Sequence, residues 1–294
     1  MAGAGIRDIK RHIRSISNIK QITRAMELVA SVKMRKAREL LGKTRPYFQT
    51  VEDAINDIII HIKEDKSREI ENEFINVREV ERTCYIIISA DRGLAGSYNI
   101  NVIRTAQGHM DEQKEASVIT VGQKAGDYFK NREYDIKGEF AQISEDPIYA
   151  DAKSVGKLCM ELYSQELVDE VYLVYTEFLS AISYRPRLTK LLPLEPKIKE
   201  FSEDNSQAVK FMLYEPSPEE VLDYLIPKYI ESMIYGALVE SSASEQSARR
   251  VAMKNATDNA GEIIDDLQLE YHRARQASIT REIAEIVGGA DALG

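Results

Sequence analysis

The stretch 217–222, Ser-Pro-Glu-Glu-Val-Leu, opens the longest helical segment that the sequence predicts. Serine is a favoured helix cap, proline is favoured at the first helical position, and glutamate three residues after the cap completes a capping box. After Pro227 no proline follows, and only Gly236 and Gly261 interrupt the segment before residues 288–289. We therefore expect one helix over most of 217–294, with almost no continuous apolar face.

The length of this helix bears on function. Residues 228–287 number 60, and at about 1.5 Å per residue they would form a rod roughly 90 Å long. A globular chain of this size has a radius of gyration of about 19 Å. We expect the rod to extend beyond any compact body, which favours reaching into a partner over catalysis.

The N-terminal segment is also predicted to be helical. Its apolar residues recur at spacings of three and four, and they are Ile6, Ile9, Ile13, Ile16, Ile19, Ile22, Met26, Val29 and Val32. Gly42 and Pro46 predict a break, followed by a second helical stretch over 47–62. Because single helices are marginal in water, the two terminal arms are expected to pair as an antiparallel coiled coil. Small residues over 241–261 would let the helix axes approach closely.

Between the arms, strands and helices alternate. Strands are predicted at 84–89, 118–121, 171–178, 183–192 and 208–214, with helices at 98–110, 123–131 and 152–167. The pair 171–178 and 183–192 is expected to form a hairpin. This alternation predicts a Rossmann-like open α/β sheet. The predicted segments are a helical arm over 1–62, a linker over 63–82, an α/β domain over 83–214 and a C-terminal helix over 217–294.

Charge is distributed unevenly along the chain. The formal net charge is −9, yet residues 1–40 carry ten Lys or Arg and three Asp or Glu. A basic arm on an acidic protein is compatible with nucleic acid, an anionic surface or an acidic protein partner, and charge alone leaves these open.

Composition restricts other classes of function. No run of 18 apolar residues exists, so no membrane-spanning segment is predicted. The N-terminus resembles neither a secretory signal nor a transit peptide. Cys84 and Cys159 favour buried thiols in a reducing compartment over a disulfide. The four histidines show no metal-ligand spacing.

Three motifs could carry chemistry. The loop Asp-Arg-Gly-Leu-Ala-Gly at 91–96 follows a strand and opens a helix, where α/β folds can bind phosphate. It lacks GxGxxG and the Lys-Ser/Thr of a P-loop, so a structural turn is favoured over a protein-contact loop or a nucleotide site. The pairs Glu282/Glu285 and Asp265/Asp266 are interpreted as solvated faces, not acid–base pairs. The tip over 279–293 is either a frayed end or a segment housed in an apolar collar of another protein.

Several long motifs carry a family resemblance. They are Ile-Thr-Arg-Ala-Met-Glu-Leu-Val-Ala at 22–30, Lys-Met-Arg-Lys at 33–36, the stretch 89–99, the helix segments 244–249, 253–259 and 274–280, and the closing pattern 279–290. Over its whole length the sequence resembles the γ subunit of F-type ATP synthases.

The resemblance implies a central rotating shaft. Its coiled coil would lie inside a ring of three α and three β subunits, and its α/β domain would rest with the ε subunit on the membrane-embedded c-ring. Flow of protons or sodium ions would turn the shaft and drive ATP synthesis in β. The chain itself would have no catalytic site, cofactor, nucleotide or nucleic acid. It would be peripheral at the cytoplasmic face of a bacterial membrane, which it meets only through the c-ring.

The resemblance also implies roles for single residues. Contacts to β subunits fall on Arg24, Met26, Lys33, Arg35, Arg249 and Gln276. Thr280, Glu282 and Glu285 line the tip within the upper sleeve, and Glu215 lies on the side of the c-ring and ε. The redox cysteine pair of photosynthetic relatives has no counterpart between 190 and 216.

Three alternatives differ in class. A nucleic-acid-binding module is disfavoured because residues 1–40 lack aromatic residues, and salt-dependent DNA binding would revive it. ATP binding to the isolated chain would favour a nucleotide-using enzyme. A static coiled-coil scaffold differs from a rotor only in whether the shaft turns.

Overall fold

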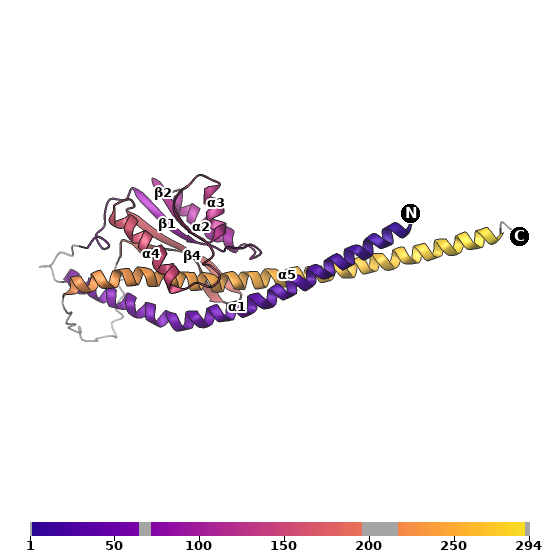
Figure 1. Ribbon diagram of the computed structural model, residues 1–294, viewed down its shortest axis with the longest axis horizontal. Helices are drawn as coiled ribbons and strands as arrows, with labels where there is room; N and C mark the ends of the chain where they lie inside the picture. Colours follow the sequence, from indigo (N-terminus) through magenta and orange to yellow (C-terminus); the bar gives the residue numbers. More distant parts are fainter. Residues whose placement is uncertain (1, 65–71, 196–216, 292–294) are drawn as a thin grey trace. The chain divides into compact units, whose positions relative to one another are not determined.

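The computed structural model describes residues 2–64, 72–195 and 217–291. In chain order the elements are α1 (Ala2–Glu64), β1 (Arg82–Ile88), α2 (Tyr98–Met110), β2 (Glu115–Val121), α3 (Gln123–Lys130), β3 (Asp135–Phe140), α4 (Tyr149–Ser164), β4 (Glu170–Ser180), β5 (Ser183–Leu192) and α5 (Pro218–Asp291) (Figure 1). Residues 33–248 form one compact unit, the sheet unit, and residues 1–32 with 249–294 form a second, the helix-pair unit.

The sheet unit is built on five strands in the order β3-β2-β1-β4-β5. Strands β3, β2, β1 and β4 are parallel, and β5 pairs antiparallel with β4 as the predicted hairpin. Strand β1 is central and buried on both faces, as its continuous apolar run predicted. The predicted fold class, an open and mostly parallel α/β sheet with long terminal helices, is confirmed.

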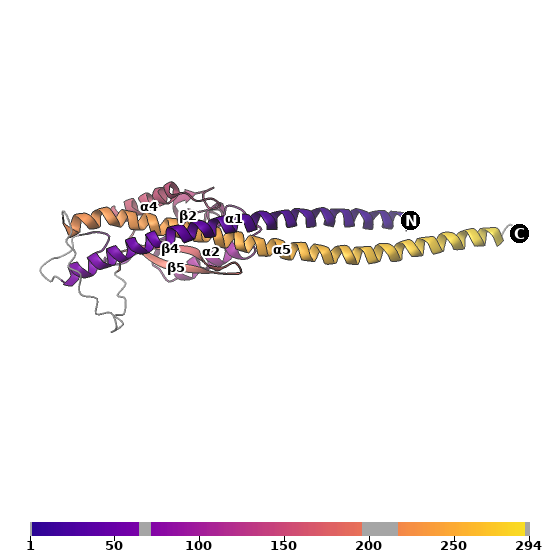
Figure 2. The ribbon, with the colours of Figure 1, turned by 90° about the horizontal axis from the view of Figure 1, so that it is seen from below.

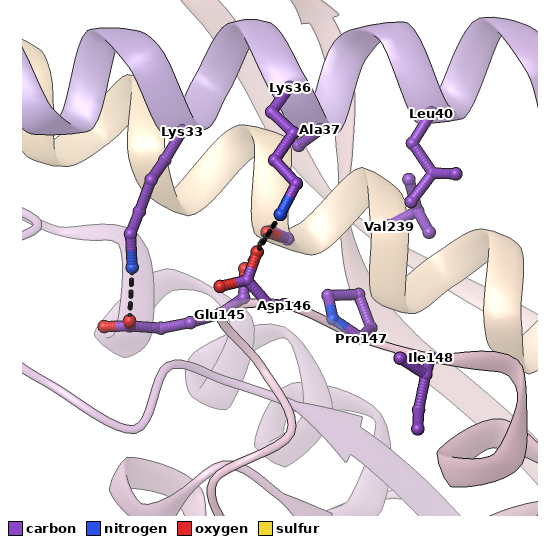
Figure 3. A pocket seen from close by; sticks show the side chains of 10 residues that line it. Lys33, Lys36, Ala37, Leu40, Glu145, Asp146, Pro147, Ile148 and Val239 are labelled. Carbon is purple, nitrogen blue, oxygen red and sulfur yellow. Dashed lines mark hydrogen bonds and ion pairs between the residues drawn. The ribbon is translucent and has the colours of Figure 1, made fainter.

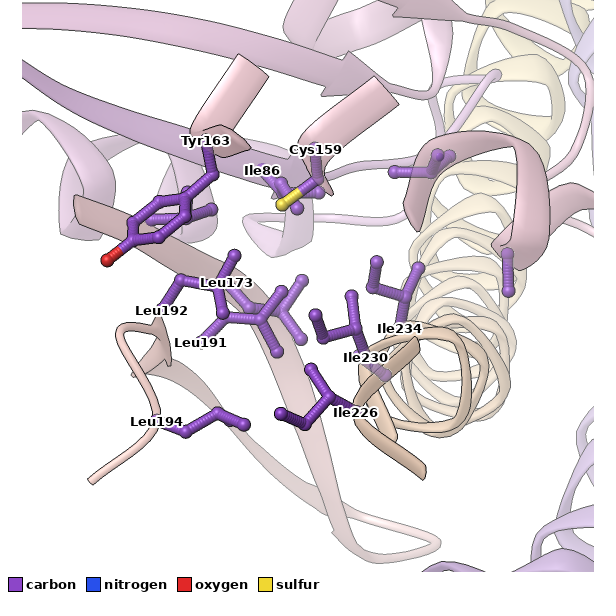
Figure 4. Close-up of a cluster of buried hydrophobic side chains, with 14 of the residues drawn as sticks. Ile86, Cys159, Tyr163, Leu173, Leu191, Leu192, Leu194, Ile226, Ile230 and Ile234 are labelled. Atoms are coloured by element: carbon purple, nitrogen blue, oxygen red, sulfur yellow. The ribbon is translucent and has the colours of Figure 1, made fainter. Parts of the chain in front are cut away.

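Helices cover both faces of the sheet. Helices α2 and α3 pack on the face that carries Tyr85 and Ile87. Helix α4, residues 51–59 of α1 and residues 222–238 of α5 pack on the face that carries Ile86. Figure 4 shows Ile226, Ile230 and Ile234 of α5 directed toward strand side chains such as Leu173 and Leu191. The spacing of four residues places these isoleucines on one stripe of the helix.

This stripe corrects two expectations. The first part of α5 does have an apolar face, and Leu222, Ile226, Ile230 and Ile234 on it are fully buried. Up to Ala248 the helix belongs to the compact unit that contains the sheet, so it does not leave that unit at Lys228 as expected. The apolar stripe is short compared with the whole helix, and for this reason the composition of 217–294 conceals it.

The predicted break at Gly42 and Pro46 is wrong, because α1 continues to Glu64 with Pro46 inside it. A proline within a helix removes one backbone hydrogen bond and is unfavourable by about 3 kcal/mol. The following turns offset this cost, since Val51, Ile55, Ile58 and Ile59 are buried in the core of the sheet unit. Tertiary packing therefore overrides the local signal.

Two further strand predictions have different outcomes. Strand β3 was not predicted, because its sequence Asp-Ile-Lys-Gly-Glu-Phe is polar at alternate positions and it lies at the edge of the sheet. The predicted strand 208–214 lies outside the described residues. In the predicted linker, 63–82, residues 63–64 belong to α1 and Arg82 begins β1, while residues 72–81 contain a turn and neither helix nor strand.

The helix-pair unit is antiparallel. The hydroxyls of Thr23 and Thr257 share a hydrogen bond of 2.8 Å. Lys20 lies beside Gly261, where an added Cβ would be 3.0 Å from its Nζ. Residue numbers therefore rise along α5 in the direction in which they fall along α1. Within this unit the two helices run side by side, and the start of α1 and the end of α5 lie at the same end of the pair (Figures 1 and 2).

The contact line of this pair follows the predicted apolar seam only in part, since five of the nine seam residues are half-buried, namely Ile6, Ile9, Ile13, Ile16 and Met26. The buried residues of this unit are Thr23, Ala30, Arg249, Met253, Thr257 and Ala260, and most of them are small. Four predicted seam residues are instead exposed by 46–59%, namely Ile19, Ile22, Val29 and Val32. The irregular spacing of the apolar residues places these four on a side of α1 that faces away from the partner helix. Small side chains take their place because they let the two axes approach closely.

Candidate functional site

The loop after β1 is held by the carboxylate of Asp91. This carboxylate accepts hydrogen bonds from the backbone N–H of Gln123 at 3.1 Å, of Gln142 at 2.8 Å and of Ser144 at 3.2 Å, and from the Ser144 hydroxyl at 2.7 Å. Asp91 thus joins three segments at the carboxyl edge of the sheet. At the N-terminus of α3 it provides the negative charge that a bound phosphate would supply there.

The remaining N-terminal amides of α3 also have partners inside the chain. Lys124 N–H donates to the carbonyl of Ala90 at 3.1 Å, and Ala125 N–H donates to the Ser89 hydroxyl at 2.9 Å. Gly122 allows this close approach, because at its φ of +90° an added Cβ would lie 2.2 Å from the Ser89 carbonyl oxygen. The loop 91–96 is therefore a structural turn, as the sequence favoured.

Helix α5 fills the place where open α/β sheets bind ligands. In such sheets the ligand lies beyond the carboxyl ends of two neighbouring strands, at the point where the chain connections lead away in opposite directions. In this sheet the two strands are β1 and β4. Tyr98 donates its hydroxyl to the Ser241 carbonyl at 3.2 Å. Ser244 donates to the Thr176 carbonyl at 3.1 Å, and Ser247 donates to the Ala181 carbonyl at 2.7 Å. Serines at a spacing of three thus join the helix to the edge of the sheet.

A second cluster joins α1 to the loop before α4. The Lys33 ammonium lies 2.7 Å from a carboxylate oxygen of Glu145, and the Lys36 ammonium lies 3.1 Å from Asp146. The Ser242 hydroxyl of α5 donates to the Glu145 carbonyl at 2.9 Å. Figure 3 shows both lysines extending from α1 toward this loop. The hollow between them is about 150 Å³, and its other lining residues include Ala37, Leu40, Pro147, Ile148 and Val239.

This cluster changes the interpretation of the basic arm. Lys33, expected to contact another subunit, has an intramolecular partner in Glu145. Arg35 lies between the two lysines in sequence, on a different side of the helix, and is exposed. Sequence reasoning missed Glu145 and Asp146, because they are more than a hundred residues away in the chain.

The helix-pair unit carries most of the other expected contact residues. Arg24 is exposed and forms an ion pair of 2.8 Å with Glu27, and Met26 is half-buried. Arg249 is buried, with 6% of its surface exposed. Gln276, Thr280, Glu282 and Glu285 are exposed along α5. Glu215 lies outside the described residues.

The helix-pair unit carries rows of exposed apolar side chains. On α1 they are Ile19, Ile22, Leu28, Val29 and Val32, and toward the end of α5 they are Ile279, Ile283, Ile286 and Val287. Extended apolar surface of this kind marks a protein interface. The sequence contained a signal for this exposure. Thr23 and Ala30 are small residues seven positions apart on α1, so they offer the partner helix a second contact line beside the large apolar residues.

The cysteines lie in the core of the sheet unit. Cys84 and Cys159 are both free and buried. Burial raises the pKa of the Cys84 thiol to about 12 and also raises that of Cys159, so both are poor nucleophiles. Across the described residues no group of His, Cys, Asp and Glu suits a metal ion. In the same residues no helix is long and apolar enough to cross a membrane.

Known proteins resemble the chain over nearly its whole length. A family model described as "ATP synthase" matches residues 5–293. The ATP synthase gamma chain of Alkaliphilus metalliredigens is 60% identical over 99% of both chains. The sodium ion specific ATP synthase gamma chain of Acetobacterium woodii is 47% identical over 98% of both. A chain of the Euglena gracilis mitochondrial ATP synthase has the same fold, with a TM-score of 0.71 and 19% identity over 99% of this chain and 95% of that one.

Proposed function

Because the chain belongs to the ATP synthase gamma chain family, we propose that it is the central rotor shaft of an F-type ATP synthase. In this role it transmits torque between an ion-driven c-ring and catalytic β subunits. It thereby couples transmembrane flow of protons or sodium ions to the synthesis or hydrolysis of ATP. Its partners are three α and three β subunits, the ε subunit and the c-ring.

The exposed surface of the helix-pair unit carries this proposal. Two antiparallel helices use small residues to contact each other and leave Ile22, Val29, Ile283 and Ile286 exposed. Full burial of a side chain of this size contributes about 1.5–3 kcal/mol, and these four keep more than half of their surface in water. A surrounding sleeve of α and β subunits would cover them.

The filled crevice at the carboxyl edge of the sheet supports a non-catalytic role. Serines of α5 occupy the nucleotide position of the fold, and Asp91 occupies the phosphate position at α3. Bound ATP would have to displace a buried helix and a carboxylate with four donors. We assign ATP chemistry to the β subunits and no cofactor, nucleotide or nucleic acid to this chain.

Contacts to the β subunits are assigned to Arg24, Met26, Lys33, Arg35, Arg249 and Gln276. Arg35 is exposed, whereas the charge of Lys33 is partly neutralised by Glu145. Exposed ion pairs contribute about 0–1 kcal/mol each. Weak and replaceable contacts suit a shaft that must pass three β subunits in turn, since a deep electrostatic minimum would stop it.

The tip and the base are assigned to opposite partners. Thr280, Glu282 and Glu285 alternate with the exposed Ile279, Ile283 and Ile286 and would lie in the upper sleeve. Glu215 is assigned to the side of ε and the c-ring. The chain would then be a peripheral protein at the cytoplasmic face of a bacterial membrane.

Co-purification tests this proposal. A β subunit with an affinity tag is isolated from cells that express the complex, and its partners are identified by mass spectrometry. We expect this chain together with α, ε and c subunits. A β preparation that contains α and is active in ATP hydrolysis but lacks this chain would contradict the proposal.

A further inference from the structure

Three serines of α5 bond to the end of strand β4. Ser241, Ser244 and Ser247 are all buried, with at most 3% of their surface exposed. The backbone N–H of Thr176 donates to the Ser241 hydroxyl at 3.3 Å, and the Ser244 hydroxyl donates to the Thr176 carbonyl at 3.1 Å. The Ser247 hydroxyl donates at 2.7 Å to the carbonyl of Ala181, in the turn after β4. Each of these bonds joins a side chain of the helix to the backbone of the sheet hairpin.

The serines satisfy backbone groups of β4 that the neighbouring strand β1 does not reach. Pairing of β1 with β4 ends at Ile87 and Val174. Thr176 lies two residues further on and is buried, and its partner on β5 is Pro186, which has no N–H to donate. Buried backbone groups need hydrogen-bond partners. Helix α5 supplies both partners of Thr176, so it takes the place of β1 where that strand stops.

Serine is otherwise unfavourable in the middle of a long helix. Its hydroxyl competes with the helix backbone for hydrogen bonds. Nevertheless, four of the seven residues 241–247 are serine. The fourth, Ser242, donates to the carbonyl of Glu145 at 2.9 Å. The four hydroxyls thus join one stretch of α5 to the end of β4, to the turn that follows it and to the loop before α4.

These hydrogen bonds oppose rotation of α5 about its own axis. Nearer the start of the helix, Ile226, Ile230 and Ile234 hold it by apolar contact, which has no preferred direction. Hydrogen bonds do have one, and they weaken steeply when donor and acceptor are misaligned. A turn of α5 about its axis moves the serine hydroxyls sideways from their backbone partners and weakens all of these bonds together. The serines therefore fix the angle of the helix more sharply than its apolar stripe does.

We propose that Ser241, Ser244 and Ser247 are positioning residues that lock the rotational angle of α5 within the sheet unit. This inference rests on the proposed function. Torque that acts on the sheet unit then turns α5 with it, and little of that torque is lost in twisting the helix inside the unit. The ion pairs of Lys33 and Lys36 with the loop before α4 contribute less to this lock, because they are partly in water and such pairs are weak.

Angular fluctuation of the stalled complex tests the lock. The α and β subunits are fixed to a surface, ATP is removed, and a bead on Val77→Cys, in the loop before β1, reports the angle of the sheet unit. The test variant combines Ser241→Ala, Ser244→Ala and Ser247→Ala. The control Ile230→Ala removes apolar contact from the same helix but no hydroxyl. Urea unfolding of each variant chain gives its stability, and Ser244→Ala is measured alone so that the test stands if the triple variant fails to assemble.

We expect the serine variants to broaden the distribution of bead angles more than Ile230→Ala does, even if Ile230→Ala loses more stability. Ion pumping driven by ATP should also fall relative to ATP hydrolysis, because part of the torque then twists the helix. Serine variants with the angular width of the native complex overturn the lock and leave the proposed function intact. Broadening by Ile230→Ala to the same width would show that packing alone fixes the angle, and it too overturns the lock. A native complex that hydrolyses ATP while its bead stays fixed overturns both proposals.

Discussion

A single carboxylate organises the edge of the sheet where related folds bind phosphate. Asp91 gathers four donors from α3 and from the loop after β3. An enzyme of this fold would leave those donors to its ligand, whereas here the chain supplies the anion itself. Asp91 thus provides, from within the chain, the negative charge that a phosphate would supply at this position.

The first prediction concerns this carboxylate. Asp91→Ala leaves its donors without an acceptor, and each unsatisfied buried group costs about 1–3 kcal/mol. Because the loop is partly open to water, we expect a total loss of about 2–4 kcal/mol in the free energy of unfolding of the full chain. Urea unfolding followed by circular dichroism measures it. The control Asp127→Ala removes only an ion pair of 4.0 Å with Lys124 and should change stability little. Equal effects of the two substitutions would contradict this account.

Acid sensitivity is predicted at Asp169. Desolvation alone would raise the pKa of Asp169, but hydrogen bonds from the side chain and backbone of Arg82 and from the backbone of Glu81 outweigh it and lower the pKa. The folded pKa is below the unfolded one, so this contribution to stability is present above the ordinary value of 3.8 and is lost as pH falls through the lowered value. We expect Asp169→Asn to flatten the fall in unfolding free energy between about pH 5 and about pH 2. Parallel pH curves for the variant and the native chain would contradict the assignment.

At the residue scale, the sequence predicted the kind of site better than it predicted which residues contact each other. It identified the turn at 91–96 as structural, because the glycine pattern lacked phosphate-binding spacing. It could not show that Lys33 has an intramolecular partner, since Glu145 belongs to a loop that only the folded chain brings to α1. Long-range ion pairs of this kind leave no periodic signal.

The long helices owe their continuity to packing, and their glycines test this. Gly42 of α1 has nothing within 4 Å of an added Cβ, whereas at Gly236 of α5 that Cβ would lie 3.1 Å from the Phe48 ring. Gly42→Ala should raise the free energy of unfolding by about 0.5–1 kcal/mol through helix propensity. Gly236→Ala has the same favourable effect on helix propensity, but its methyl group would crowd the Phe48 ring. We therefore expect no net increase in the free energy of unfolding. Urea unfolding of both variants measures the difference, and an equal gain would show that α1 and α5 do not approach closely there.

The register of the helix pair is tested by engineered cysteines. Oxidation of the double variant Thr23→Cys with Thr257→Cys should form a disulfide, because the two hydroxyls lie 2.8 Å apart. The matched control, Ile22→Cys with Thr257→Cys, uses a residue of the predicted seam that is 59% exposed, and it should not form one. Thiol titration and mass spectrometry report the outcome. Preferential bonding at position 22 would restore the seam predicted from sequence.

At the element scale most helices and strands could be predicted, because apolar periodicity and turn residues mark them. Strand β3 was missed because an edge strand is polar on one face. The break at Pro46 was wrong because burial of Val51 and Ile55 outweighs a lost hydrogen bond. The seam of α1 was wrong at Ile19, Ile22, Val29 and Val32, because all of its large apolar residues were assumed to face the partner helix.

At the scale of the whole molecule, both long helices take part in two compact units. Residues 33–64 of α1 and 218–248 of α5 supply core side chains to the sheet unit. Residues 2–32 and 249–291 form a helix pair with exposed apolar residues. The sequence could predict the long C-terminal helix from its cap and from the lack of proline after Pro227, whereas it predicted α1 as two shorter helices. It could not predict where each helix passes from one unit to the other, since no residue pattern marks the boundaries at 32–33 and 248–249. By the proposed function, residues 33–64 and 218–248 mainly stabilise the fold, and residues 2–32 and 249–291 carry most of the contacts to partners.

Rotation observed in single complexes tests the central claim most directly. In this assay α and β subunits are fixed to a surface, and a bead is attached through Val77→Cys, which is 71% exposed while both native cysteines are buried. The account predicts that the bead turns in one direction while ATP is hydrolysed and stops when ATP is removed. A complex that hydrolyses ATP while the bead on this chain stays fixed would make the protein a static scaffold and contradict the account.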